Sequence, residues 1–205
     1  TGLGTGFTGN KLFKYILIFL YRISFIKSSK IFFHNSHDMK YFVNLGISNN
    51  ANSIILPGSG VNLNIFKYSK LENRQLNLNL NFLYFGRMLK EKGLEELIKT
   101  SILIKKKFIN ITFTFVGSCD DNNKSSLKME YLQNLNKLNV INYIEHTNKI
   151  IDYIIDSDCV ILPSYREGFP KSLIEASAIG RPMITSNIPG CRDIVTDGYN
   201  GFLFN

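Results

Sequence analysis

Two glutamates, Glu167 and Glu175, lie eight positions apart on either side of a Gly-Phe-Pro turn. The apolar segment 159–163 precedes them and predicts a buried parallel strand that ends at a proline, and residues from Lys171 onward predict a helix. A strand, an irregular turn and a helix in this order place the loop at the carboxyl edge of a parallel sheet, where open α/β folds bind ligands. The helix N-terminus suits a diphosphate, and the carboxylates can accept hydrogen bonds from sugar hydroxyls. The segment therefore predicts a nucleotide-sugar site.

Five short motifs follow one another along residues 55–205. They are Leu-Pro-Gly-Ser-Gly-Val-Asn at 56–62, the Gly-Arg…Lys-Gly turn at 85–93, Arg-Glu-Gly-Phe-Pro-Lys-Ser-Leu-Ile-Glu-Ala at 166–176, Gly-Arg-Pro-Met-Ile at 180–184 and Asp-Gly-Tyr-Asn-Gly-Phe-Leu at 197–203. Together and in this order they resemble the GT4 family of retaining glycosyltransferases (glycosyl transferases group 1). Each motif alone is weak evidence for the family, but five motifs in the family's order are strong evidence.

The resemblance implies an α/β fold of GT-B type, with two Rossmann-like domains built on doubly wound parallel sheets. We expect residues 1–66 to be the C-terminal part of an acceptor domain and residues 80–205 to be an incomplete donor domain. The polar segment 67–79 lacks an apolar period and is expected to link them. The chain starts at Thr1 and stops at Asn205 just after a strand-like segment, so we expect a fragment truncated at both ends.

Arg87 and Lys92 lie on the turn that follows the first predicted strand of the second domain. The resemblance implies that this pair contacts the donor diphosphate, where charge-assisted hydrogen bonds are worth about 1.5–3 kcal/mol each. The alternative is a solvated surface pair, which is the reading we favour for Lys90 and Glu91. Glu167 completes the expected catalytic set: the family precedent is binding of a donor-sugar hydroxyl, and the alternative is a covalent nucleophile.

The resemblance also implies a donor-binding set and a cleft loop. The donor-binding positions are Ile144, Gly168, Phe169, Pro170, Ser172, Leu173 and Glu175. Ile144 ends a predicted strand where backbone groups would read the nucleobase, and Glu175 would accept hydrogen bonds from the ribose. The cleft loop would contain Gly2, Gly4 and Gly60.

Residues 4–9 fit the Gly-x-Gly-x-x-Gly pattern of dinucleotide-binding folds. A dinucleotide site needs a strand before this pattern and an acid about 20 residues after it. No strand precedes it, and the first acid in the chain is Asp38. We therefore exclude an NAD site here. Many members of the family carry a histidine at the equivalent place, and residues 1–5 contain none.

The sequence predicts neither a metal site nor a cofactor. The cysteines Cys119, Cys159 and Cys191 are widely spaced, so a reducing cytoplasm is the default compartment. The three histidines show no metal-ligand spacing, and Asp193 and Asp197 do not form an Asp-x-Asp pair. Loss of diphosphate would instead be assisted by the cations Arg87 and Lys92 and by the helix dipole.

The net charge of +8 has its clearest local source in residues 11–30, which contain five basic residues and no acid. The apolar run 15–21 is much shorter than the roughly 20 residues of a spanning helix. Such a helix can lie in the headgroup region of an anionic bilayer, or it can pack against its own sheet. The basic residues do not interleave with aromatic residues in an RNA-binding motif, so we expect no nucleic acid partner.

These features predict transfer of a sugar from a nucleoside diphosphate, namely a UDP-sugar, to an acceptor hydroxyl with retention of configuration. We expect a lipid-linked saccharide acceptor in surface polysaccharide or glycolipid synthesis, on the cytoplasmic face of the membrane. One alternative is a nucleotide-sugar phosphorylase, hydrolase or epimerase on the same architecture. Another is a non-catalytic membrane or nucleic-acid binding module. The presence of all four polar site residues argues against such a module, namely Arg87, Lys92, Glu167 and Glu175.

Alternation of apolar runs and helical periods predicts the order of elements. The predicted strands are 31–34, 52–56, 80–85, 111–116, 140–144 and 160–162. The predicted helices are 37–45, 93–108, 123–138 and 149–156. This alternation indicates a doubly wound parallel sheet.

Overall fold

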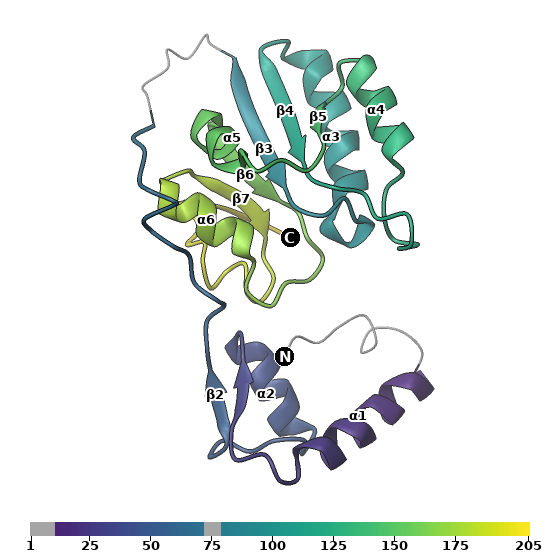
Figure 1. The fold of residues 1–205 in the computed structure, drawn as a ribbon, viewed down its shortest axis with the longest axis vertical. Coiled ribbons are helices and arrows are strands. Elements are labelled where there is room, and N and C mark those ends of the chain that lie inside the picture. The colour runs from purple at the N-terminus through teal and green to yellow at the C-terminus, as the bar shows by residue number, and fades with distance from the viewer. Residues whose placement is uncertain (1–10, 72–78) are drawn as a thin grey trace.

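The computed structural model describes residues 11–71 and 79–205 and arranges them in two units (Figure 1). The first unit is the smaller. It contains α1 (Lys11–Phe25), β1 (Ile31–Phe33), α2 (Ser36–Asn44) and β2 (Ser53–Ile55). The two strands pair in parallel, with Phe32 opposite Ile54. The expected helix in the basic segment, the two expected strands and the helix between them are all present.

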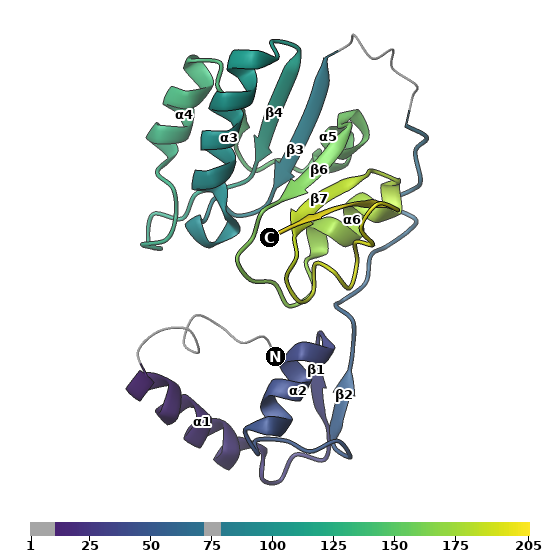
Figure 2. The same cartoon turned by 180° about the vertical axis from the view of Figure 1, so that it is seen from behind.

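The second unit is built on a six-stranded sheet in which every strand pair is parallel. Its elements are β3 (Leu80–Phe85), η2 (Lys90–Lys92), α3 (Leu94–Lys107), β4 (Ile111–Val116), α4 (Met129–Lys137), β5 (Asn142–Ile144), α5 (Ile150–Asp156), β6 (Cys159–Leu162), α6 (Lys171–Ile179), β7 (Met183–Ser186) and β8 (Gly201–Phe204). Helices α3 and α4 cover one face of the sheet, and α5 and α6 cover the other (Figures 1 and 2). The expected α/β fold with a doubly wound parallel sheet is confirmed.

The strand order β5-β4-β3-β6-β7-β8 contains one topological switch point, between β3 and β6. The chain moves outward from β3 to β5, returns to β6, and then moves outward in the other direction. Ligands of open α/β sheets bind outside the carboxyl ends of the strands at such a point. Here these ends carry residues 86–93 and 163–171, so the sheet brings two motifs of the sequence together.

The core of the second unit consists of near-continuous apolar strands. The four residues of β6 are all buried, and Leu83 on β3 and Phe115 on β4 are completely inaccessible. Continuous apolar runs are typical of parallel strands that are covered on both faces. Phe82 and Phe113 stack across β3 and β4 with ring centroids 5.4 Å apart, an arrangement that favours this register.

The first unit has a separate aromatic core around Phe42 of α2. The ring of Phe42 lies 5.3 Å from the ring of Tyr21 and 5.3 Å from the ring of Phe33. Helix α1 therefore packs on α2 along one side, and Arg22 donates a hydrogen bond to the carbonyl of Leu45. Most of the other apolar side chains of α1 are exposed, Phe19 among them.

The segment between β2 and β3 returns along the C-terminal end of α6. The N–H of Ser69 donates to the carbonyl of Ile179 at 3.0 Å, and Arg181 donates to the carbonyl of Ser69. Tyr68 packs on Gly180, where a Cβ would lie 2.7 Å from Tyr68 Cε2. The described part of the predicted linker 67–79 is therefore attached to the second unit, and residues 72–78 lie outside the described residues.

The helix predicted over 123–138 is wrong at its start, because α4 begins only at Met129. Residues 125–127 instead pair with the chain that follows β3. The N–H of Leu127 donates to the carbonyl of Met88 at 2.7 Å, and the N–H of Lys90 donates to the carbonyl of Ser125 at 2.8 Å. These bonds satisfy backbone groups that an extra helical turn would have used.

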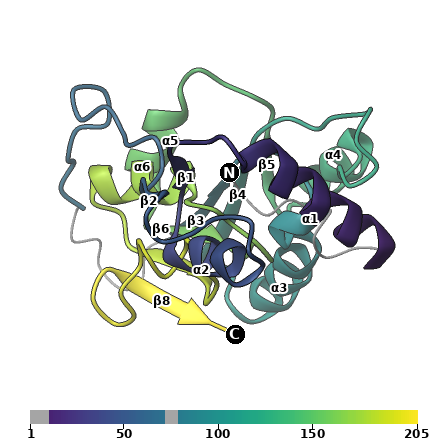
Figure 3. The same cartoon turned by 90° about the horizontal axis from the view of Figure 1, so that it is seen from below.

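The strands of the second unit run toward the first unit. Seen from below, α2 and the strands β1 and β2 lie across the carboxyl end of the larger sheet (Figure 3). One hydrogen bond between the units joins Asn35 to Gly168, with 2.9 Å between Nδ2 and the carbonyl oxygen. The first unit therefore faces the switch point.

Candidate functional site

Arg87 is carried by a tight turn at the end of β3. The N–H of Gly86 continues the β3–β4 ladder by donating to the carbonyl of Val116 at 3.0 Å. The buried hydroxyl of Tyr84 donates to the carbonyl of Arg87 at 2.7 Å, and burial raises the pKa of that phenol well above its ordinary value. The phenol therefore stays protonated and donates the hydrogen bond that fixes the turn. The Arg87 side chain remains exposed.

Lys92 reaches the site from the short helix η2. The helix closes at Gly93 with a φ of 71°, and a Cβ there would lie 2.0 Å from the carbonyl oxygen of Pro163. Only glycine allows this approach and this conformation without strain. The close contact packs η2 against the chain that leaves β6, and it places Lys92 beside the loop that carries Glu167.

Glu167 is held by two donors. Its Oε1 lies 2.6 Å from Lys92 Nζ and accepts a hydrogen bond of 2.6 Å from the hydroxyl of Ser164. The side chains of Lys92 and Glu167 are 21% and 11% exposed, so water screens the pair only in part. These two bonds orient the carboxylate, and Glu167 lines the cavity at the switch point.

Helix α6 directs its N-terminus at the same place. Pro170 occupies the N-cap position, and no side chain caps the first turn. The partial positive charge of this end therefore attracts an anion. Glu175 lies one turn further on, with Lys171 Nζ at 3.6 Å from its Oε1. Burial raises the pKa of Glu175 above its ordinary value, and Lys171 opposes that rise.

These groups surround a cavity of about 260 Å³ at the switch point. Its lining comprises Tyr84, Phe85, Gly86, Arg87, Lys92, Leu162, Glu167, Pro170, Lys171, Ser172 and Glu175. A neighbouring cavity of about 290 Å³ shares four of these residues and extends toward β4 and β5. Three cations and two carboxylates thus meet beside a helix N-terminus, an arrangement suited to a diphosphate with attached hydroxylated groups.

Comparison with known proteins agrees with this geometry. Residues 71–205 match the family described as glycosyl transferases group 1. The chain belongs to this family. It is 30% identical over 214 residues to the N,N'-diacetylbacillosaminyl-diphospho-undecaprenol alpha-1,3-N-acetylgalactosaminyltransferase of Campylobacter jejuni, covering 98% of this chain and 54% of that enzyme. It is also 30% identical over 202 residues to the capsular polysaccharide biosynthesis glycosyltransferase CapM of Staphylococcus aureus, covering 94% of this chain and 53% of that protein.

Among solved structures, the HepE protein of Anabaena in complex with UDP aligns with a TM-score of 0.76 at 18% identity. The alignment covers 100% of this chain and 56% of that one. The structural likeness confirms the expected GT-B type of fold. The chain spans about half the length of the curated relatives it matches.

The structure of this glycosyltransferase-family chain brings together the three expected catalytic residues and three of the seven expected donor-binding residues. Six of them line the cavity of about 260 Å³, namely Arg87, Lys92, Glu167, Pro170, Ser172 and Glu175. Leu173 is completely buried in the core, so its side chain faces away from the cavity. Gly168 and Phe169 lie instead against the first unit, where a Cβ on Gly58 would meet Phe169 Cδ1 at 2.6 Å.

The remaining expected positions lie further from the cavity. Ile144 ends β5 and accepts a hydrogen bond from the N–H of Gly117 at 3.0 Å, while the following residues His146 and Thr147 line the neighbouring cavity. Gly60 adopts a φ of 69°, and a Cβ there would meet nothing within 4 Å. The glycine is therefore explained by the backbone conformation of a turn, and no neighbouring group packs closely against it. The expected cleft-loop residues Gly2 and Gly4, like the whole of segment 1–10, lie outside the described residues.

The sequence did not single out Tyr84, Ser164, Lys171 or Asn35 as site residues. Ser164 had a weak signal, because it follows the proline that ends β6 and lies three positions before Glu167. Tyr84 and Asn35 had none, because each acts through a hydrogen bond to the backbone of a loop rather than through a motif.

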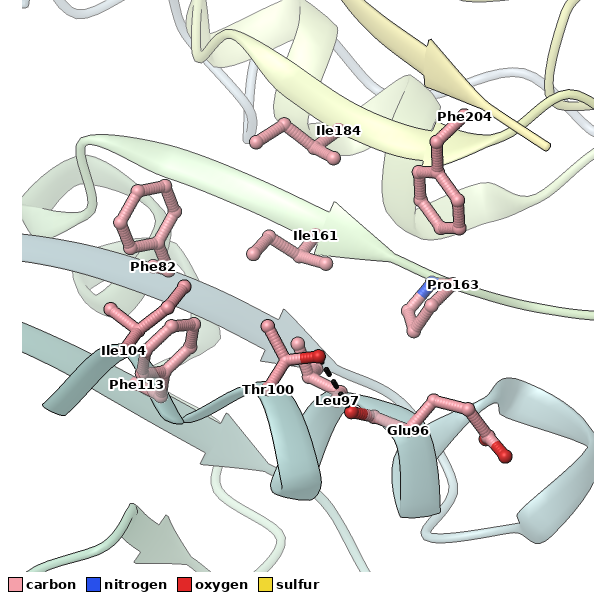
Figure 4. Close-up of a pocket in the computed structure, with 10 residues that line it drawn as sticks. All are labelled: Phe82, Glu96, Leu97, Thr100, Ile104, Phe113, Ile161, Pro163, Ile184 and Phe204. Carbon is pink, nitrogen blue, oxygen red and sulfur yellow. Dashed lines mark hydrogen bonds between the residues drawn. The ribbon is translucent and has the colours of Figure 1, made fainter. Parts of the chain in front are cut away.

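A third cavity, of about 310 Å³, lies on the α3 side of the sheet and is almost entirely apolar (Figure 4). Its lining combines strand residues such as Phe82 and Ile161 with α3 residues, and Glu96 is the one ionisable side chain in the lining. It offers no cation for a phosphate, so it is not part of the candidate site.

Metal-binding clusters and membrane-spanning helices are both absent from residues 11–71 and 79–205. Within these ranges no group of three His, Cys, Asp or Glu side chains is placed to hold a metal ion. No helix in the same ranges has both the length and the apolar character needed to span a bilayer.

Proposed function

We propose that the protein transfers a sugar from a UDP-sugar to a hydroxyl of a lipid-linked saccharide during surface polysaccharide or glycolipid synthesis, as a retaining enzyme of GT4 type. The observation that carries this proposal is the cavity at the switch point, where Arg87, Lys92 and the N-terminus of α6 face Glu167 and Glu175. Cations and a helix dipole suit the diphosphate of a nucleotide-sugar, and carboxylates in the same cavity suit its sugar hydroxyls.

The chemistry assigned to each group follows from its charge and its surroundings. Arg87, Lys92 and the first turn of α6 hold the diphosphate and stabilise the negative charge that develops as the bond to the sugar breaks. Glu175 accepts hydrogen bonds from the ribose, and Glu167 accepts one from a hydroxyl of the donor sugar. No metal ion is needed in this scheme, because two side-chain cations offset the charge of the leaving diphosphate.

The relatives support the choice of donor and acceptor. The name of the Campylobacter jejuni relative describes an acceptor linked to diphospho-undecaprenol. HepE of Anabaena has been solved in complexes with UDP and with UDP-glucose. We therefore choose UDP as the nucleotide and a polyprenyl-linked saccharide as the acceptor of this protein.

We extend the proposal to an anionic membrane surface on the cytoplasmic side as the place where the acceptor is met. Residues 11–30 carry five basic residues and no acid, and α1 exposes Leu12, Phe13 and Phe19 to solvent. Basic charge beside an exposed apolar helix face is the combination that binds the headgroup region of anionic bilayers. Co-sedimentation with phosphatidylglycerol vesicles, compared with phosphatidylcholine vesicles, tests this directly. Equal sedimentation with both would contradict it, as would an undiminished effect after Leu12→Ser with Phe19→Ser.

The transfer itself is tested with the intact protein, labelled UDP-sugars and a polyprenyl-diphosphate-linked saccharide. Transfer that requires the acceptor supports the proposal, and nuclear magnetic resonance of the product reports whether the anomeric configuration is retained. Consumption of the UDP-sugar without acceptor favours a hydrolase, and conversion to another UDP-sugar favours an epimerase. If the folded protein binds no nucleotide, the non-catalytic binding module becomes the better account.

A further inference from the structure

We propose that Asn35, in the first unit, is a positioning residue that clamps the loop carrying Glu167. Its Nδ2 donates a hydrogen bond of 2.9 Å to the carbonyl oxygen of Gly168, although the two residues are 133 positions apart in the chain. Asn35 is 1% exposed, so the donor end of the bond is shielded from competing water. The mechanistic consequence of the clamp rests on the proposed function, whereas the clamp itself does not.

Both ends of the Asn35 amide are used, and this fixes its orientation. Its Oδ1 accepts a hydrogen bond of 2.8 Å from the N–H of Asp38 and so caps the N-terminus of α2. Its Nδ2 faces the carbonyl oxygen of Gly168. A flipped amide would set a donor against a donor and an acceptor against an acceptor, so only one orientation satisfies both partners.

The loop that Asn35 contacts is held from both units. The second unit holds the Glu167 side chain through Lys92 and Ser164. In the first unit, Asn35 holds the next residue, Gly168, by its carbonyl, and Gly58, on the segment that follows β2, packs against Phe169.

Two further contacts restrict Gly168. Gly190 packs against its carbonyl, since a Cβ on Gly190 would lie 2.4 Å from the Gly168 carbonyl oxygen. His34 lies over Gly168, with its Cδ2 3.6 Å from the position of a Cβ there. Gly168 and Phe169 therefore lie between the units, directly after the residue that carries the site carboxylate, Glu167.

The clamp predicts a separation between nucleotide binding and turnover. Arg87 and Glu175 are positioned by contacts within the second unit and do not contact Asn35 or the loop that it clamps. Loss of the clamp should leave UDP affinity within about twofold, and it should lower kcat by about tenfold or more because Glu167 then leaves its contact with the donor sugar. A residue that merely stabilised the fold would lower both together.

Two substitutions separate the clamp from the cap. Asn35→Asp and Asn35→Ser both retain an oxygen that can accept from the N–H of Asp38, because aspartate and serine are good N-cap residues. Neither can reproduce the Nδ2 donor to Gly168. If Asn35 acts only as a cap, both variants should behave as the wild type. If it clamps the loop, both should show the same defect.

The first readout is hydrogen–deuterium exchange of the whole chain, which requires no activity. Exchange in residues 165–170 should rise by about three- to tenfold in both variants, the effect of losing one hydrogen bond, while exchange in α2 stays unchanged. Unchanged exchange in 165–170, or an equal rise in α2, would overturn the clamp. The second readout is kcat against UDP affinity in the intact protein. If the wild type binds no UDP, the proposed function fails, and the exchange result still decides the clamp.

Discussion

Lys92 and Glu167 meet across the topological switch point of the sheet, with 2.6 Å between Nζ and Oε1 and 75 positions between them in the chain. One follows β3 and the other follows β6, so the ion pair exists only because these two strands are neighbours. Ser164 donates to the same carboxylate oxygen. The pair holds a cation and a carboxylate at the candidate site before any ligand is bound.

Breaking this pair should lower stability in a way that depends on which partner is removed. Lys92→Met leaves a mostly buried carboxylate without its cation, so the free energy of unfolding should fall by about 1–3 kcal/mol. Glu167→Gln should cost less, because the amide can still accept from Ser164 and from Lys92. Urea unfolding of the two single variants and the double variant measures the coupling. Strictly additive losses would show that the pair contributes nothing to the folded state.

Glu175→Gln should increase stability at neutral pH. Burial raises the pKa of Glu175, so the folded chain binds this proton more tightly than the unfolded chain. Stability from this group is therefore fully present at low pH and is lost as the pH rises through the raised value. The variant should exceed the wild type in urea unfolding at pH 7–8, and the difference should shrink as the pH is lowered toward 4. Glu145→Gln, at an exposed position, is the control and should show no such gain. A loss of stability in Glu175→Gln at pH 7 would mean that the ion pair with Lys171 outweighs the burial.

Gly93→Ala should be far more destabilising than Gly198→Ala. Both glycines have a positive φ, of 71° and 75°, so both substitutions carry the cost of a left-handed conformation, about 1–2 kcal/mol. At Gly198 a Cβ meets nothing within 4 Å, whereas at Gly93 it would lie 2.0 Å from the Pro163 carbonyl oxygen. Relieving that clash should cost about 1–3 kcal/mol more. Thermal unfolding of the two variants gives the comparison, and equal losses would show that η2 does not pack on the chain leaving β6.

Tyr84→Phe should weaken both stability and nucleotide binding. The variant leaves the Arg87 carbonyl without the buried hydroxyl that donates to it at 2.7 Å, at a cost of about 1–3 kcal/mol. The turn that carries Arg87 should then loosen, and the affinity for UDP should fall severalfold. Tyr199→Phe is the matched control, because Tyr199 is 88% exposed. Unchanged UDP affinity in Tyr84→Phe would show that the turn is fixed without this bond.

Much of the fold could be predicted because its strands are parallel and covered on both faces. Segment 159–162 is a continuous apolar run, and segment 111–116 alternates apolar residues with threonine. Both patterns indicate strands from the residue pattern alone. The start of α4 could not be predicted in the same way. Residues 125–127 pair with residues 88–90, and an interaction between segments so far apart leaves no periodic signal in either.

The candidate site, like the fold, could be predicted from the sequence only in part. Arg87, Lys92, Glu167 and Glu175 could be proposed because they belong to motifs, and the cavity at the switch point contains all four. Two of the groups that orient this site, Tyr84 and Asn35, act through hydrogen bonds to the backbone. Asn35 reaches Glu167 only through the carbonyl of its neighbour, and a residue type with so many ordinary roles gives no hint of this in the sequence.

The central claim is that the cavity at the switch point binds UDP, and calorimetric titration of UDP into the folded chain tests it most directly. ADP and GDP serve as competing nucleotides, and Lys106→Ala, at an exposed position on α3, serves as the control variant. The account predicts saturable binding of UDP that Arg87→Ala and Glu175→Ala each weaken by tenfold or more, as expected for the loss of about 1.5–3 kcal/mol, and that Lys106→Ala leaves unchanged. A folded chain that binds no UDP, or a Glu175→Ala variant whose affinity stays within about twofold of the wild type, would contradict it.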